Sequence, residues 1–238
     1  MPVNVDTVYQ RVLAIANKEQ RGYITPQEYA LLANKAQLLI FEQYFYDIDK
    51  AQEQHGNNTE HSDRMHVLNE KIAPFQNTNV DMATTSGSTM TLPTAVHKLG
   101  TVFYNDGTKN IKVERIDAEE AEMMQQTALY TSTQLRPVYV RRTATNLQLY
   151  PSTAIPGYAT STVNCNYISK PSQVVWGYTV INSQALYDAT TSTDFSLQAS
   201  EEGELVYKVL ELAGVVLNKP GLVQIATNED TALAAQKQ

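Results

Sequence analysis

The sequence is poor in cysteine and in positive charge. A single cysteine, Cys165, excludes an internal disulfide framework and any metal site built from several thiolates. Lys and Arg number 18 against 25 Asp and Glu, which gives a formal net charge of −7. Because a protein that grips nucleic acid must neutralise phosphates with concentrated Lys and Arg, this balance argues against a general nucleic-acid binder.

The common sequence motifs of nucleotide sites and hydrolases are also missing. We find no Walker-type Gly-rich loop, no G-x-G-x-x-G run, no G-x-S-x-G elbow and no H-E-x-x-H pair. The first residues lack the basic and apolar regions of a signal peptide, and no run approaches the roughly 18 apolar residues of a membrane span. We therefore expect a protein without enzymatic activity, cofactor or membrane contact, assembled in a cytoplasm.

Two clusters of metal-ligating or acidic residues have structural explanations. His55, His61 and His66 lie close in sequence, but spacings of six and five do not place them on one helical face. We expect no metal site there, although a bound ion stays open as an alternative. A second cluster follows residue 116, and its acids suit the N-terminus of a helix better than acid–base chemistry; its members are Asp117, Glu119, Glu120 and Glu122.

Residues 1–73 have the pattern of helices. Val5, Val8 and Val12 recur at helical spacing. Thr25-Pro-Gln-Glu28 predicts a helix start in which Thr25 caps and Glu28 reaches back to it. A wide apolar stripe follows, so residues 1–73 are expected to form a helical hairpin with a flanking helix. Residues 74–94, rich in Asn, Thr, Ser and Gly, are predicted to be a linker.

Residues 95–190 are predicted to form the β-rich domain. One hairpin is expected over residues 99–116 around an Asp-Gly turn, and another over 137–151. A short helix from Asp117 interrupts them, and two more strands are expected over 162–168 and 173–180. Cys165 alternates with apolar neighbours and is expected to be buried. Short strands at this spacing indicate a small sandwich or barrel.

Residues 191–238 are expected to hold an amphipathic helix and a polar tail. Ser200 is placed as the N-cap, an acidic first turn follows, and Gly214 marks the expected end. One face of this helix carries four apolar residues that we assign to a subunit or partner interface: Leu205, Val209, Leu212 and Val216. The fold class is thus α+β: an N-terminal helical hairpin or bundle, an antiparallel β-sandwich or small barrel, and an amphipathic C-terminal helix.

Polar and aromatic residues of the β-rich part offer two further contact surfaces. Arg136, Arg141 and Arg142 flank the second hairpin and are expected to pair with acids across an interface, or else to touch phosphate. Trp176 and the 14 tyrosines could form a carbohydrate platform. Tyrosines in β-rich proteins more often serve as core rims or subunit contacts, so carbohydrate binding is kept as the alternative from a different functional class.

Several short phrases occur in an order that resembles one family. They are Arg136-Pro-Val-Tyr-Val-Arg141, Leu147-Gln-Leu-Tyr-Pro151, Tyr167-Ile-Ser-Lys-Pro171, Val175-Trp-Gly-Tyr178, Asp194-Phe-Ser-Leu197 and the segment from Ser200 to Val215. Their order is similar to that in head–tail connector proteins, the ring or adaptor proteins of short-tailed and crAss-like tailed phages. The resemblance covers about residues 95–217 and, more loosely, the N-terminal helices.

The resemblance implies a structural virion protein with no catalytic residues. It implies a ring of about twelve copies seated beneath the portal protein, joining the capsid to the tail and letting DNA pass. The implied partners are further copies of the chain, the portal, and neighbouring tail or ring proteins. Another tail or head-completion subunit is the nearest alternative. A net acidic chain suits a channel that DNA passes through without being held.

Overall fold

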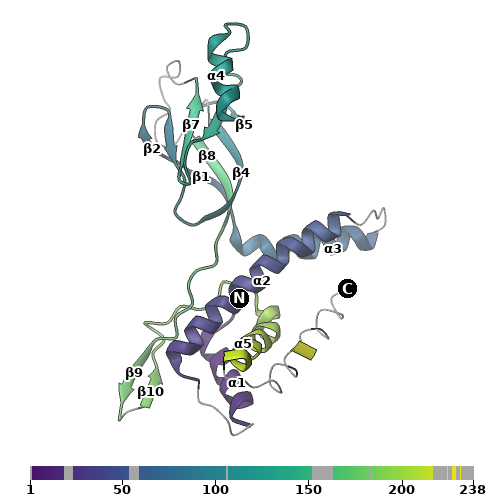
Figure 1. Cartoon of the computed structure of the whole chain (residues 1–238), viewed down its shortest axis with the longest axis vertical. Coiled ribbons are helices and arrows are strands. Elements are labelled where there is room, and N and C mark those ends of the chain that lie inside the picture. Colours follow the sequence, from purple (N-terminus) through teal and green to yellow (C-terminus); the bar gives the residue numbers. More distant parts are fainter. Residues whose placement is uncertain are drawn as a thin grey trace. The chain divides into compact units, whose positions relative to one another are not determined.

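The structure is a computed structural model that describes residues 2–18, 24–53, 59–105, 107–151, 163–182 and 184–216, with a few isolated positions beyond. The chain divides into two compact units (Figure 1). The helical unit combines Met1–Pro74 with Pro171–Gln238, and the barrel unit is Phe75–Lys170. The fold class is α+β, as the sequence predicted.

The helical unit is built from helices at both ends of the chain. Helix α5 packs against α1 and α2, and α3 packs against α2. A 3-10 turn, η2, leads into α5, and a two-stranded hairpin completes the described part of the unit (Figure 1). The elements are α1 (Val5–Lys18), α2 (Pro26–Glu53), α3 (Thr59–Ile72), β9 (Tyr178–Ile181), β10 (Gln184–Tyr187), η2 (Ala199–Glu201) and α5 (Glu202–Val216).

The predicted start of α2 is confirmed. The Glu28 backbone N–H donates to Thr25 Oγ1 at 3.3 Å, and Glu28 Oε2 accepts the Thr25 backbone N–H at 3.0 Å. Both hydrogen bonds satisfy amides that a helix N-terminus leaves without intrahelical partners. The Thr25 backbone N–H and the Thr25 hydroxyl both donate to Glu28 Oε2, and these two bonds lower the pKa of the Glu28 carboxyl.

The barrel unit is an eight-stranded, mostly antiparallel sheet in the order β1-β8-β4-β5-β6-β7-β3-β2. The two strands that end this order, β1 and β2, follow each other in the chain with only Met82 between them. One continuous segment therefore borders both edges, and the sheet curls into a nearly closed barrel. The elements are η1 (Ala73–Phe75), β1 (Gln76–Asp81), β2 (Ala83–Ser86), β3 (Thr89–Thr91), β4 (Val96–Asn105), β5 (Asn110–Arg115), α4 (Ala118–Gln126), β6 (Val138–Arg141), β7 (Asn146–Tyr150) and β8 (Val163–Ser169).

Both predicted hairpins and the short helix between them are confirmed. Strands β4 and β5 pair antiparallel, as do β6 and β7. Inside the barrel, Cys165 is buried with Met90, Val102 and Leu147. Helix α4 covers part of the outer surface of the sheet, where Ala121 packs in a second apolar cluster, formed with Val138, Val140 and Tyr150.

Two domain boundaries differ from the expectation. Residues 74–94 are not a linker, because they contain β1, β2 and β3. The barrel unit ends at Lys170, so residues 171–190 belong to the helical unit. The single strand expected over 173–180 is not formed; Val175 makes an isolated bridge with Thr193, and β9 begins at Tyr178.

The ends of α5 also differ from the expectation. Ser200 is not the N-cap, because η2 precedes the helix and its cap position is Gln198. Gly214 does not end α5, which continues to Val216. Ala213 and Gly214 are buried along this last turn, and such packing overrides the local preference of glycine for a helix end.

Candidate interaction surfaces

Two amide side chains of α2 hold the chain where it returns from the barrel. Asn34 Oδ1 accepts the Val174 backbone N–H at 2.8 Å, and Asn34 Nδ2 donates to the Val174 carbonyl at 2.9 Å. Gln37 joins two separate stretches of the returning chain: its Nε2 donates to the Ser172 carbonyl at 2.8 Å and its Oε1 accepts the Ser196 N–H at 2.9 Å. We call Asn34 and Gln37 the amide clamp. It fixes a segment that has little secondary structure of its own.

The segment Asp194–Leu197 binds the N-terminus of the chain. The Val3 N–H donates to the Leu197 carbonyl, and the Phe195 N–H donates to the Val3 carbonyl. The Asp194 carboxylate accepts the Val5 N–H at 2.9 Å, at the first turn of α1. Phe195 and Leu197 are fully buried. One of the phrases that carries the family resemblance therefore serves as an internal docking segment.

Five aromatic rings join α1, α2 and the base of the β9–β10 hairpin. The Tyr9 ring lies 4.6 Å from that of Tyr29 and 4.7 Å from that of Trp176, between ring centroids. Trp176 in turn stacks on Tyr178 at 5.7 Å and contacts Tyr187 at 5.8 Å. Tyr178 and Tyr187 are paired opposite each other in the hairpin, so this aromatic cluster holds the hairpin's base on the helices.

Trp176 is unsuited to the carbohydrate platform considered above. Its side chain is only 5% exposed, and its indole N–H donates to Asp6 Oδ1 at 3.0 Å. A platform for a sugar needs an exposed aromatic face. Carbohydrate binding, the alternative function, therefore loses Trp176 as a stacking surface.

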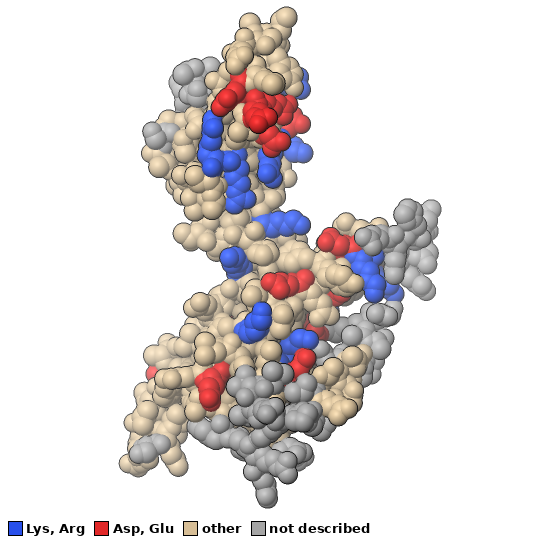
Figure 2. Space-filling model, in the orientation of Figure 1, with Lys and Arg blue, Asp and Glu red and all other residues tan. Residues whose placement is uncertain are grey.

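The hairpin itself is exposed on both faces beyond this base. Val180 is 65% exposed on the face that carries Tyr178, and Ile181 is 54% exposed on the other face with Leu186. Residues 178–187 contain no charged side chain, and Figure 2 shows the hairpin free of acidic and basic atoms on the visible side. An isolated two-stranded hairpin is at best marginally stable in water, so an apolar, uncharged one indicates a contact surface.

Gly177 lets the hairpin sit where it does. A Cβ at this position would lie 2.7 Å from the backbone carbonyl carbon of Thr191. The Gly177 N–H donates to Ser192 Oγ at 2.9 Å, and its carbonyl accepts the Asp188 N–H at 2.9 Å. The base of the hairpin is thus held by close backbone packing as well as by rings.

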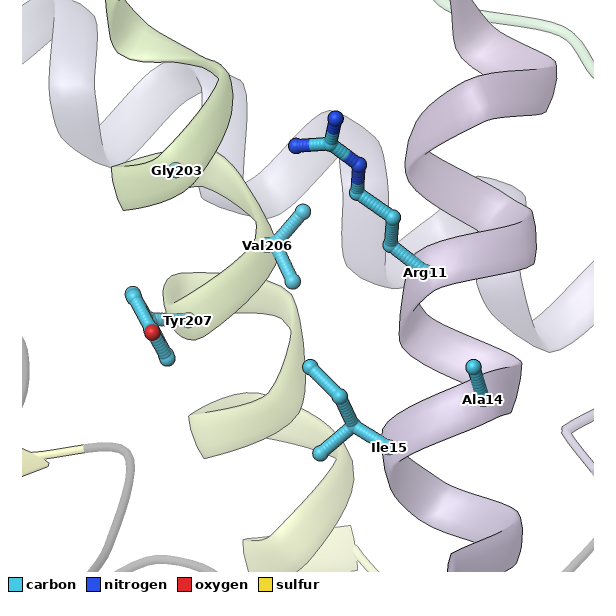
Figure 3. A pocket seen from close by; sticks show the side chains of 6 residues that line it. All are labelled: Arg11, Ala14, Ile15, Gly203, Val206 and Tyr207. Carbon is cyan, nitrogen blue, oxygen red and sulfur yellow. The ribbon is translucent and has the colours of Figure 1, made fainter.

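A groove of about 280 Å³ lies between α1 and α5 (Figure 3). Ile15 of α1 and Val206 of α5 face each other across it (Figure 3). Arg11 lies at one end and pairs with Glu202 at 3.1 Å, so its charge is already compensated. The lining residues are Arg11, Ala14, Ile15, Gly203, Val206 and Tyr207. The groove is largely apolar and is sized for a few aliphatic side chains.

A buried ion pair fixes the start of α5. Lys71 Nζ lies 3.0 Å from Glu201 Oε1, and the Glu201 side chain is 1% exposed. The same ammonium lies 5.7 Å from the centre of the Tyr44 ring. Burial, with the carboxylates of Glu201 and Glu204 nearby, raises the pKa of the Tyr44 hydroxyl far above its ordinary value. These groups serve the interior of the unit and are not exposed to a partner.

The interface assigned to α5 needs correction. Leu205 and Val209 are fully buried because α5 packs on α1 and α2. Side chains covered by their own unit cannot meet a neighbouring subunit, so both belong to the core. Leu212 is half-buried, and the side chain of Val216 lies outside the described residues.

The three arginines predicted at an interface lie in the barrel unit. Arg141 donates to the Ala144 carbonyl at 2.9 Å, and Arg142 donates to the Tyr150 hydroxyl at 2.8 Å. Both therefore brace their own hairpin. Arg136 is exposed in a turn, where its backbone N–H donates to the Thr133 carbonyl at 3.0 Å.

A second exposed apolar surface lies around α4. Its members are Met123, Leu129, Tyr130 and Leu135, and Leu129 is 100% exposed. The acids of the first turn of α4, Glu119 and Glu120, lie beside it in sequence. We call these four apolar residues the α4 tip. Sequence reasoning missed both the α4 tip and the hairpin. The signal for the hairpin was Asn182, because Asn favours the left-handed conformation of hairpin turns, and its φ is 52°.

The histidine cluster is only partly described. His55 lies outside the described residues, the side chain of His61 is likewise not described, and His66 is exposed on α3. Within the described parts of the chain, no three His, Cys, Asp or Glu side chains are placed to hold a metal ion. Over the same residues, no helix is long and apolar enough to cross a membrane.

The chain matches no protein family, and no curated protein sequence is significantly similar to it.

Proposed function

We propose that the chain is a structural virion protein that forms an oligomeric head–tail connector ring beneath the portal. In this role it joins capsid to tail while DNA passes through the ring. It acts through surfaces and uses no catalytic residue or cofactor. The portal, neighbouring tail or ring proteins and further copies of the chain are its partners.

The exposed, uncharged hairpin on a firmly anchored base is the observation that carries the proposal. The amide clamp and the aromatic cluster hold the base of the hairpin, while Val180 and Ile181 lie exposed at its far end. A monomer gains nothing from presenting such residues to water. The α4 tip gives the barrel unit a contact surface of its own, as a subunit with several neighbours requires.

The resemblance to head–tail connector proteins is the reason for proposing a ring as the assembly. Its phrase Asp194–Leu197 docks the N-terminus, and its phrase Val175–Tyr178 leads into the hairpin. The first phrase therefore stabilises the helical unit, and the second leads into its exposed contact element. A ring needs two different surfaces on each subunit, because its contacts run head to tail.

Light scattering during size-exclusion chromatography, followed by negative-stain microscopy, tests the proposal. The purified chain, alone or mixed with the portal protein of its own phage, should form closed rings. A chain that stays monomeric at about 100 µM and does not bind the portal would refute it. Binding on a glycan array would instead favour the carbohydrate alternative.

A further inference from the structure

We propose that the tip of the β9–β10 hairpin of one copy docks into the α1/α5 groove of a second copy of this chain. The inference rests on the proposed function and gives the ring contact its residues. The knob is Val180 and Ile181, the last two residues of β9. The hole is the groove whose lining includes Ile15 and Val206.

Both surfaces belong to the same compact unit and match in chemistry. The hairpin residues 178–187 carry no charge, and the one ionic side chain of the groove lining, Arg11, is paired with Glu202. Inserting an apolar tip therefore leaves no charge without a partner, which would otherwise be costly. The volume of about 280 Å³ suits two or three aliphatic side chains.

The knob and the hole lie on opposite sides of α1. Tyr9 contacts Trp176 at the hairpin's base, whereas Arg11, Ala14 and Ile15 line the groove. At about 100° per residue, these three residues lie roughly 140–240° around the helix from Tyr9. The hairpin lies on one side of α1 and the groove on the other, so each can contact a different adjacent copy, as a head-to-tail contact requires.

The contact is the anchor of a larger interface. A stable protein–protein interface buries about 1,200–2,000 Å², which is more than a hairpin tip can supply. Apolar anchors in pockets nevertheless carry most of the binding energy in such interfaces. The surrounding surfaces of adjacent helical units would complete the contact.

Two charged variants test the contact. Val180→Asp places a carboxylate on the knob, and Ile15→Asp places one in the hole. Leu31→Asp is the control, because Leu31 is an exposed aliphatic residue of the same unit, outside the hairpin and the groove. We expect each of the first two variants to lower the ring fraction at least tenfold at fixed concentration, with Leu31→Asp equal to wild type.

Mixing the two variants distinguishes this contact from others. Val180→Asp protein keeps an intact hole and Ile15→Asp protein keeps an intact knob, so an equal mixture should give a heterodimer that neither variant forms alone. If Ile15→Asp protein still forms rings, the groove is not the docking site and the inference is wrong. If Ile15→Asp protein alone stops at a dimer, the hairpins contact each other and the inference is equally wrong.

A cross-link identifies the occupant of the groove. Mild oxidation of a mixture of Val180→Cys and Ile15→Cys proteins should give a disulfide between them, and Lys35→Cys in place of Ile15→Cys should not. Native Cys165 is buried in the barrel and stays unreactive.

A benzoylphenylalanine at position 15 that links only to residues 217–238 of its own chain would overturn the inference. If the wild-type chain forms rings but the two cysteine variants give no disulfide, only this inference is wrong. If the wild-type chain never assembles, the proposed function is wrong as well.

Discussion

Removing one amide of the clamp should loosen the helical unit by a measurable amount. Asn34 makes two hydrogen bonds to the Val174 backbone, at 2.8 and 2.9 Å, and Val174 is buried. Each bond contributes about 1 kcal/mol net, and a buried peptide group left without a partner costs about 1–3 kcal/mol more. We therefore expect Asn34→Ala to lower the free energy of unfolding by about 2–4 kcal/mol.

Tryptophan fluorescence during urea unfolding measures this loss in the correct unit. Trp176 is the only tryptophan of the chain and is buried in the helical unit, so its signal does not report on the barrel. With a denaturant slope of about 2 kcal/mol per M, the midpoint should fall by about 1–2 M. Lys35→Ala, an exposed neighbour on α2, is the control and should stay within about 0.5 kcal/mol of wild type.

An isosteric change separates hydrogen bonding from packing. Asn34→Asp keeps the size of the side chain, but its carboxylate cannot donate to the Val174 carbonyl, which accepts a bond at 2.9 Å in the native chain. It should therefore destabilise the unit at least as much as Asn34→Ala does. The reasoning fails if either variant unfolds at the wild-type midpoint, because the clamp would then contribute nothing.

Changes at three further residues test the structure. Thr25→Ala removes the cap of α2 and should lower the Trp176 midpoint by less than Asn34→Ala does; the Glu28 carboxyl, whose pKa Thr25 lowers, should then titrate at a higher pH by NMR. Lys71→Ala leaves the buried Glu201 carboxylate without its ion pair and should cost about 3 kcal/mol in the same urea assay, whereas an unchanged midpoint would contradict that role. Burial raises the pKa of the Cys165 thiol from 9.0 to about 11, so a disulfide reagent at pH 8 should label it only after unfolding. The stabilisation from this neutral thiol is complete below pH 9 and lost as the pH rises toward 11, so barrel stability should fall less over that window in Cys165→Ala.

The parts of the fold with local signals could be predicted from the sequence. The cap at Thr25 and Glu28 needs only residues three apart, and its hydrogen bonds are present. The β4–β5 pairing likewise arises within one short stretch, where Gly107 has a φ of 84° between the two strands. Such signals depend on neighbours along the chain, so a pattern of residues is enough to read them.

The parts held by distant contacts could not be predicted. Residues 76–91 are rich in Asn, Thr and Ser because most of their side chains face outward, and only a few, such as Met82 and Met90, face the barrel core. That composition is indistinguishable from a polar linker. The return of residues 171–198 to the helical unit depends on Asn34 and Gln37, more than 130 residues away. The residues next to either partner in the sequence do not predict such hydrogen bonds.

The base of the β9–β10 hairpin is tightly packed, whereas its tip is exposed. The phrase Val175–Tyr178 of the family resemblance holds Trp176, which is buried, and Gly177, where a Cβ would collide with Thr191. The exposed tip at Val180 and Ile181 lies just beyond that phrase. Trp176 and Gly177 are therefore the residues whose packing positions the hairpin, whereas Val180 and Ile181 at its tip are exposed. We expect exchanges at the tip to leave the Trp176 unfolding midpoint unchanged and, under the proposed function, to alter which subunit is bound.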